Sequence, residues 1–166
     1  VVQQVAYATL SRRDRKASHL AVISQLEAEG ASGGDLAPIL GQHYLDAIDA
    51  VPSDPDVEAL KLAAIDLLAE AAGRAQLLGS TKEAAAHMTA ALALAGDTDN
   101  RAGLERDLAY ALLDTGAYEE AIEHAIEAAS AFESRGDAVN AGHAVAAQSL
   151  ALGFLGDNAQ SLAVAE

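Results

Sequence analysis

A glycine followed at once by helix-starting residues recurs in the second half of this 166-residue chain. The three copies are centred on Gly79, Gly116 and Gly156, which lie 37 and 40 residues apart. Glycine readily ends a helix because it adopts the left-handed conformation without a steric penalty. Each copy is therefore predicted to be the turn of a helix–turn–helix unit, and its recurrence predicts a stack of such units.

Small residues accompany these turns at fixed positions. About a quarter of the chain is alanine, whereas aromatic residues make up 4% and tryptophan is absent. Alanine favours helices and fills the face of a sheet badly, which argues against a sandwich or barrel. A small residue stands seven positions before and five after each turn glycine: Ala72, Ala109 and Ser149 before it, and Ala84, Ala121 and Ser161 after it. Small side chains there let the two helices of a unit approach closely.

The other helix boundaries are marked by capping residues and by further glycines. The predicted starts are Ser11, Asp35 (with Pro38 in the first turn), Asp54-Pro55, Ser80 (in a capping box with Glu83), Asp97 or Asp99, Tyr118 and Asp137. The predicted ends are Glu29, Val51-Pro52, Gly79, Gly96, Gly116, Gly136 and Gly156. We expect an all-α fold without strands.

The repeated units resemble the tetratricopeptide repeat family, whose pattern alternates small and larger apolar residues around a turn glycine. The matching residues are Leu108, Ala109, Leu112, Tyr118, Ala121 and Ala128 in the middle copy, Ala71, Ala72, Ala75, Ala84, Met88 and Ala91 in the first, and Val145, Ser149, Leu152, Gly156 and Ser161 in the third. Glu105 departs from the pattern at a bulky position, the family proline is missing, and the units are longer than usual. The resemblance implies a right-handed α-solenoid of stacked antiparallel helix pairs.

The first part of the chain carries a second resemblance. The segments 5–20 and 40–47 are similar to the end of an ATPase module, and to the helical hairpin after it, in large bacterial signalling proteins. In that family a nucleotide-cyclase or DNA-binding domain joins a STAND or AAA-type ATPase and then a tetratricopeptide array. We therefore divide the chain into 1–52, leading out of such a module, and 53–166, with units at about 57–96, 97–136 and 137–166. Because the chain begins at Val1 and its single methionine is Met88, we expect it to be a piece of a longer protein.

The tetratricopeptide resemblance also implies a binding face. In that family the first helix of each pair lines a concave groove that receives a partner. The corresponding residues with chemistry suited to partner binding are Asp66, Gln76, Arg106, Tyr110, Asp114, His143, Leu150 and Phe154. Tyr110 and Phe154 are candidate anchors, or else pack against an adjacent helix.

A basic cluster stands near the start of the chain. It consists of Arg12, Arg13, Arg15 and Lys16, and the ATPase resemblance predicts a contact across a domain junction there. The alternative is a solvated helix face, which is the usual fate of a run of charges. The formal net charge of −15 argues against a nucleic-acid surface, because neutralising phosphates needs clustered cations.

The chain lacks the motifs of the common catalytic and cofactor sites. It contains no phosphate-binding loop, no dinucleotide fingerprint, no nucleophile elbow and no zinc-protease motif. The segment 97–100 begins like a calcium loop, but Arg101 and Leu108 stand where ligands are required, so a helix start is the better interpretation. The histidines His19, His43, His87, His124 and His143 form no pair four residues apart, and we expect half-exposed helix histidines rather than a metal site. No catalytic residue, cofactor or metal is therefore expected.

These patterns together predict a non-catalytic regulatory module that binds a protein or peptide partner, or an attached ATPase domain, on its concave face. The alternative is the small-molecule effector-sensing arm of a STAND-type transcriptional regulator. The absence of cysteine and of a long apolar run predicts a cytoplasmic protein that does not enter a membrane. A stack that ends inside a helix pair leaves an apolar edge, so pairing of two chains is a further expectation.

Overall fold

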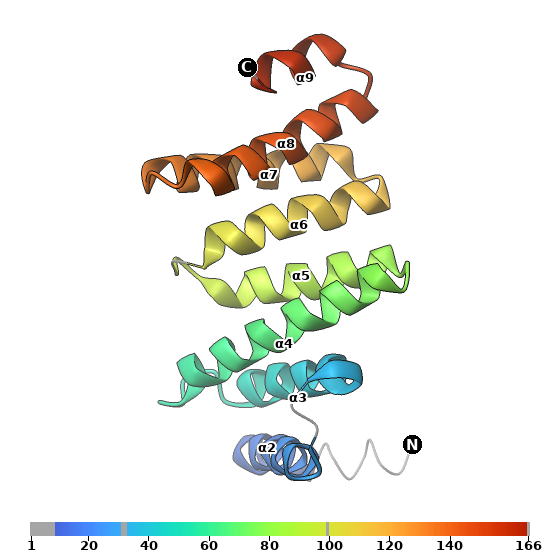
Figure 1. Cartoon of the computed structure of the whole chain (residues 1–166). Helices are drawn as coiled ribbons and strands as arrows, with labels where there is room; N and C mark the ends of the chain where they lie inside the picture. The colour runs from blue at the N-terminus through green and yellow to red at the C-terminus, as the bar shows by residue number, and fades with distance from the viewer. Residues whose placement is uncertain (1–8, 31–32, 99, 166) are drawn as a thin grey trace. The chain divides into compact units, whose positions relative to one another are not determined.

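Helices make up all the regular structure in the part of the chain that the computed structural model describes, which is residues 9–30, 33–98 and 100–165 (Figure 1). The elements are α2 (Arg12–Ala28), the 3-10 turn η1 (Gly34–Leu36), α3 (Ala37–Ala50), α4 (Val57–Leu77), α5 (Thr81–Ala95), α6 (Arg101–Thr115), α7 (Tyr118–Ser134), α8 (Ala138–Phe154) and α9 (Asn158–Ala165). The prediction of an all-α fold is confirmed for these residues.

The chain forms two compact units, Val1–Ala71 and Ala72–Glu166, and α4 contributes residues to both. The division that the sequence predicts after residue 52 concerns a junction with a preceding module and stays a prediction. None of the helices in the described ranges combines the length and the apolar character that a membrane span requires.

In the first unit, α2 packs against α3, and α3 approaches α4 closely. Gly41 marks this approach, because a methyl group added to its Cα would lie 3.2 Å from Leu68 Cδ2. The buried apolar side chains of this unit include Ile23, Leu40 and Ile48. The helix α2 contributes little else to the core, since most of its residues are exposed.

In the second unit, each helix from α5 to α9 packs against the next one along the chain, and α6 also packs against α8 (Figure 1). The small residues that the repeat pattern singles out are buried: Ala72, Ala84, Ala91, Ala109, Ala121 and Ala128 are each at most 1% exposed. The burial that the repeat pattern predicts for these positions is thus confirmed.

The third copy replaces two of these alanines with serine. Ser149 Oγ donates a hydrogen bond to the Ser161 carbonyl at 3.0 Å, and Ser161 Oγ donates to the Ser149 carbonyl at 2.9 Å. The reciprocal pair satisfies both hydroxyl groups between α8 and α9, as half-buried polar groups require. Serine therefore occupies, in the third copy, the two positions that hold alanine in the other copies.

The turn at Gly116 has the geometry that its sequence predicts. Gly116 has a φ of 83°, in the left-handed region that favours glycine. The amide of Ala117 donates to the Leu112 carbonyl and that of Gly116 to the Leu113 carbonyl, each at 3.1 Å. These two bonds form a Schellman motif, which satisfies carbonyl groups that the end of a helix leaves without partners.

The predicted caps at Ser11 and Asp137 are present, whereas the predicted helix starts at Asp35 and Asp54 are wrong. Ser11 and Asp137 accept hydrogen bonds from the amides three residues later, as N-caps do. Asp35 instead lies inside η1, and α3 follows directly with Leu36 at its N-cap, because backbone carbonyls of the 3-10 turn already accept the first amide protons. Asp54 does not start α4, which begins at Val57, because its carboxylate is paired with Lys16.

The boundaries on either side of α5 also differ from expectation. Ser80 stands at the N-cap of α5, but its side chain makes no cap hydrogen bond. The predicted capping box is therefore absent. The helix α6 begins at Arg101 rather than at Asp97, and the amide of Thr98 donates to the Ala95 carbonyl, as in a turn that follows α5. The other predicted start, Asp99, lies outside the described residues.

Enlarging a buried alanine should destabilise the second unit far more than enlarging its exposed neighbour. We expect Ala147→Leu, at a fully buried position of α8, to lower the free energy of unfolding by about 1–3 kcal/mol. Ala146→Leu changes the adjacent exposed residue by the same atoms and should have an effect within about 0.5 kcal/mol. Urea unfolding followed by circular dichroism measures both, and equal losses would contradict the close helix contact.

Candidate functional site

Two side-chain hydrogen bonds join α6 to α8, the predicted first helices of two successive units. Tyr110 Oη donates to the His143 carbonyl at 2.9 Å, and Arg106 Nη1 donates to Asn140 Oδ1. The earlier donor, Arg106, pairs with the earlier acceptor, Asn140, and the later donor, Tyr110, pairs with the later acceptor, His143. The helices α6 and α8 therefore run parallel at this contact. By the same offset, Asp114 on α6 lies level with the turn of α8 that precedes Leu150. A shared face of the two helices is therefore formed within the second unit.

Arg106 and Tyr110 are engaged within the chain. Arg106 Nε donates to Asp107 Oδ1 at 2.8 Å, and the guanidinium carbon lies 5.8 Å from the centroid of the Phe132 ring. At this distance a guanidinium gains a favourable interaction with the aromatic face. With the hydroxyl of Tyr110 bonded to α8, these two side chains hold neighbouring helices in place.

Four of the predicted groove residues on α6 and α8 are exposed, and three of them lie towards the carboxyl ends of these helices. The side chains of Asp114 and His143 are exposed, as are Leu150 (50%) and Phe154 (63%). The Phe154 ring also stacks on Tyr118 of α7, with ring centroids 5.0 Å apart and an interplanar angle of 16°. Phe154 thus packs within the chain and still presents apolar surface to solvent.

The remaining two predicted residues of the groove belong to α4. Gln76 is exposed near the end of that helix, in the second unit. Asp66 belongs to the first unit, where it lines a cleft of about 350 Å³ with Leu40 and Tyr44. Burial and the neighbouring carboxylate of Glu27 raise the pKa of the Tyr44 hydroxyl. The placement of all eight residues on one groove stays a prediction.

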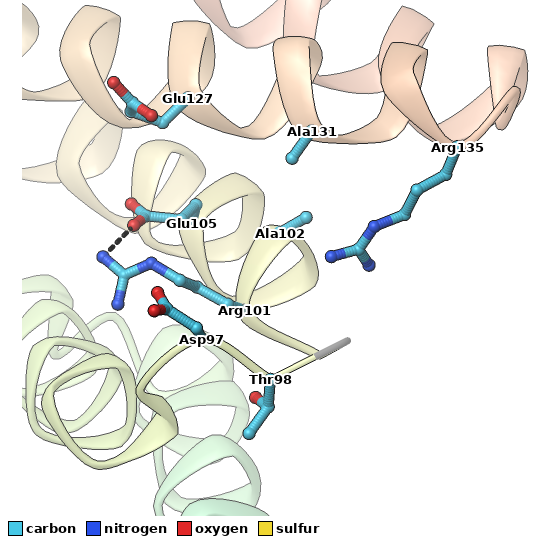
Figure 2. Close-up of a pocket in the computed structure, with 8 residues that line it drawn as sticks. All are labelled: Asp97, Thr98, Arg101, Ala102, Glu105, Glu127, Ala131 and Arg135. Atoms are coloured by element: carbon cyan, nitrogen blue, oxygen red, sulfur yellow. Dashed lines mark hydrogen bonds and ion pairs between the residues drawn. The ribbon is translucent and has the colours of Figure 1, made fainter.

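A charged cleft of about 290 Å³ lies between the start of α6 and the last turns of α7 (Figure 2). Arg101 and Glu105 line its α6 side, and Arg135 reaches into it from the end of α7. The other lining residues are Asp97, Thr98, Ala102, Glu127 and Ala131. Two guanidinium groups and three carboxylates line the cleft, so its chemistry suits a polar group rather than an apolar anchor.

Glu105 is the buried charge of this cleft, with 4% of its surface exposed. Arg101 Nη2 donates to Oε1 at 2.7 Å, and His124 Nδ1 lies 2.5 Å from Oε2. Because an ionised carboxylate can only accept, the His124 Nδ1 carries the proton of this bond. Both oxygens of Glu105 are therefore satisfied, which explains how a carboxylate replaces the bulky residue of the repeat pattern.

The structure brings together His19 of α2 with His43 and Asp46 of α3, which the sequence analysis did not combine. The two Nδ1 atoms lie 2.9 Å apart, and His19 Nδ1 lies 3.7 Å from Asp46 Oδ2. The His19 side chain is only 12% exposed, less than expected for a surface histidine. Burial lowers the pKa of His19, and the neighbouring His43 lowers it further, against the opposite effect of Asp46. The available signal was the spacing of His43 and Asp46, which places both on one face of a helix.

The basic cluster is divided between internal and surface contacts. Lys16 is buried, and its Nζ donates to Asp54 Oδ2 at 2.6 Å and to Asp56 Oδ1. Burial lowers the pKa of Lys16, but the hydrogen bonds and charges of the two carboxylates outweigh this effect and raise it above its ordinary value. Arg12 and Arg15 line a cleft of about 190 Å³ together with Asp46, Asp49 and Ala50. The contact with a preceding module stays a prediction.

The parallel pair α6 and α8, the charged cleft and the histidine cluster are features of this chain's own geometry. No protein-family model, curated protein or solved structure matches the chain. Contacts between its own side chains therefore carry the functional argument.

Removing the charge of Lys16 should destabilise the first unit. Lys16→Met keeps most of the aliphatic stem but leaves Asp54 and Asp56 without their shared cation. Because these carboxylates are 31% and 50% exposed, solvent screens part of the effect, and we expect a loss of about 1–3 kcal/mol in the free energy of unfolding. Arg13→Met, at an exposed position of the same helix, serves as the control. Equal urea midpoints for the two variants would contradict the internal role of Lys16.

Removing Arg101 should cost more than removing the carboxylate that it neutralises. Arg101→Ala leaves Glu105 buried with one partner fewer, for an expected loss of about 1–2 kcal/mol. Glu105→Leu removes the buried charge, while Arg101 and His124, 42% and 30% exposed, regain water, so we expect a change within about 1 kcal/mol. Thermal unfolding of both variants tests the order, and a larger loss for Glu105→Leu would contradict it.

Proposed function

We propose that the chain is a non-catalytic interaction module of the tetratricopeptide type, a right-handed solenoid that binds a protein or peptide on the face of its first helices. The single observation that carries this proposal is the parallel contact of α6 and α8 through Tyr110 and Arg106. Parallel first helices of successive units, each followed by an antiparallel second helix, are what a stack of helix pairs requires. The buried alanines and the glycine turns support the same arrangement.

The chemistry of the exposed residues indicates the kind of partner. Leu150 and Phe154 offer apolar surface towards the carboxyl end of α8, and Asp114 is an exposed carboxylate at the carboxyl end of α6, which packs parallel to α8. Exposed aromatic and aliphatic side chains beside a polar rim are typical of binding hot spots. The net charge of −15 attracts basic partners and repels acidic ones. The best-fitting partner is a segment with an apolar anchor flanked by lysine or arginine.

The proposed role in a larger protein follows from the resemblance of segments 5–20 and 40–47 to an ATPase module and the hairpin after it. Residues 5–8 of the first segment lie outside the described part of the chain. In this role, a partner that binds across successive first helices changes their stacking and thereby biases the attached ATPase. Lys16, with its raised pKa and two carboxylate partners, stabilises the first unit, through which such a change would pass.

The charged cleft favours one alternative, the sensing of a small effector. Arg101 and Arg135 flank a cleft of about 290 Å³, a volume at the lower end of small-molecule sites. A small zwitterion or anion is the ligand that this lining suits. This alternative uses a different surface from the face of α6 and α8, so the two functions are separable by mutation.

The experiment that tests the proposal compares two sets of exposed apolar residues on one helix. The double variant Leu150→Ser, Phe154→Ser should lose more than about 90% of the protein captured from a bacterial lysate by the wild-type chain, since hot-spot losses exceed ~1.4 kcal/mol. Val139→Ser, at a 70% exposed position near the start of α8, should retain capture.

Circular dichroism shows whether each variant keeps its helices. Capture that survives the double variant would refute binding on this face. Stabilisation of the wild type by small anions, lost in Arg135→Ala, would favour the effector alternative instead.

A further inference from the structure

The cluster of His19, His43 and Asp46 joins two helices of the first unit. His19 comes from α2, and the other two residues lie one turn apart on α3, which packs against α2. One ligand atom from each residue lies within 4.8 Å of the others, and all three residues are half-buried. In the described part of the chain, no other group of three histidine or carboxylate side chains brings its ligand atoms within this distance of one another.

The distances suit a metal ion with short bonds to nitrogen and oxygen. Ligand bonds of ~2.1 Å in a tetrahedron place neighbouring ligand atoms ~3.4 Å apart. The separations of 2.9 Å between the two Nδ1 atoms and of 3.7 Å between His19 Nδ1 and Asp46 Oδ2 lie on either side of this value. The two imidazole rings are tilted by 47° rather than stacked, with their centroids 5.2 Å apart. The two Nδ1 atoms are about 0.5 Å closer together than the tetrahedral value.

A further residue orients the carboxylate. Gln42 Nε2 donates to Asp46 Oδ1 at 2.8 Å, while the other oxygen, Oδ2, is the one near His19. Hydrogen bonds of this kind fix the orientation of ligands around metal sites. The buried Ala47 and Ile48 on the same helix hold the rotation of α3, and with it the positions of His43 and Asp46.

We propose that His19, His43 and Asp46 bind a divalent transition-metal ion, with Zn²⁺ as the best fit. Two imidazoles and one carboxylate form a donor set of intermediate softness, which favours zinc, copper and nickel over calcium and magnesium. Three protein ligands leave a fourth position for water or an external ligand. Arg12 and Arg15 line the cleft that Asp46 shares with Asp49, so an anion is the external ligand that the surroundings favour.

The proposal is independent of partner binding by the second unit, and binding of the metal itself tests it. The chain is freed of metal with a chelator and titrated with Zn²⁺ by calorimetry. We expect one ion per chain, a higher melting temperature with Zn²⁺ and no comparable effect of Mg²⁺. His19→Asn, His43→Asn and Asp46→Asn should each weaken binding by at least the ~10-fold that loss of an orienting residue alone produces. His143→Asn, at an exposed position of α8, is the matched control.

X-ray absorption of the zinc-loaded wild type keeps the test decisive where a variant fails to fold. Two imidazole ligands and oxygen donors are expected around the ion. Absence of stoichiometric Zn²⁺ binding would overturn the proposal and leave a hydrogen bond between two histidines. Binding that persists in all three variants, falls equally in His143→Asn, or shows no imidazole ligand would overturn it as well.

Discussion

The close contact of helices through alanine is the constraint on which the second unit depends. Alanine buries little apolar surface, so each contact gains its energy from the approach of the two helix backbones rather than from large interlocking side chains. Leu40 and Leu108 are the largest side chains that are almost completely buried in the described ranges. Where fully buried alanines such as Ala121, Ala125 and Ala147 pack between helices, a much larger side chain would force the helices apart.

A core of small residues leaves the register of the helices weakly specified, because alanines can slide past one another with little change in contact. Polar contacts supply the missing specificity at fixed places. Tyr110 fixes α6 against α8, the reciprocal serine pair fixes α8 against α9, and Glu105 joins α6 to α7 through His124. Each of these bonds has strict distance and angle requirements, so one register satisfies it and a shifted register does not.

The parts of this fold that could be predicted from the sequence depend on interactions between residues close together in the chain. The turn at Gly116 depends on the backbone freedom of one residue, and the caps at Ser11 and Asp137 on hydrogen bonds to the next turn, so these features were predictable. Asp54 looked equally suited to capping, but Lys16, 38 positions earlier in the chain, occupies its carboxylate. A long-range ion pair competes with a local cap, and the sequence alone does not reveal which interaction prevails.

The contrast between local signals and long-range contacts also applies to the proposed partner-binding face and the histidine cluster. The positions of the proposed partner-binding face follow from the repeat register, and three of them, Asp114, Leu150 and Phe154, are exposed. Arg106 and Tyr110 belong to the same register, yet their own contacts with α8 and Phe132 occupy them. The histidine cluster lies outside the repeats, so no repeat register could predict it. Its three side chains come from α2 and α3. Its signal appears only when α2 and α3 are packed, because convergence of side chains is a property of the folded chain rather than of spacing along it.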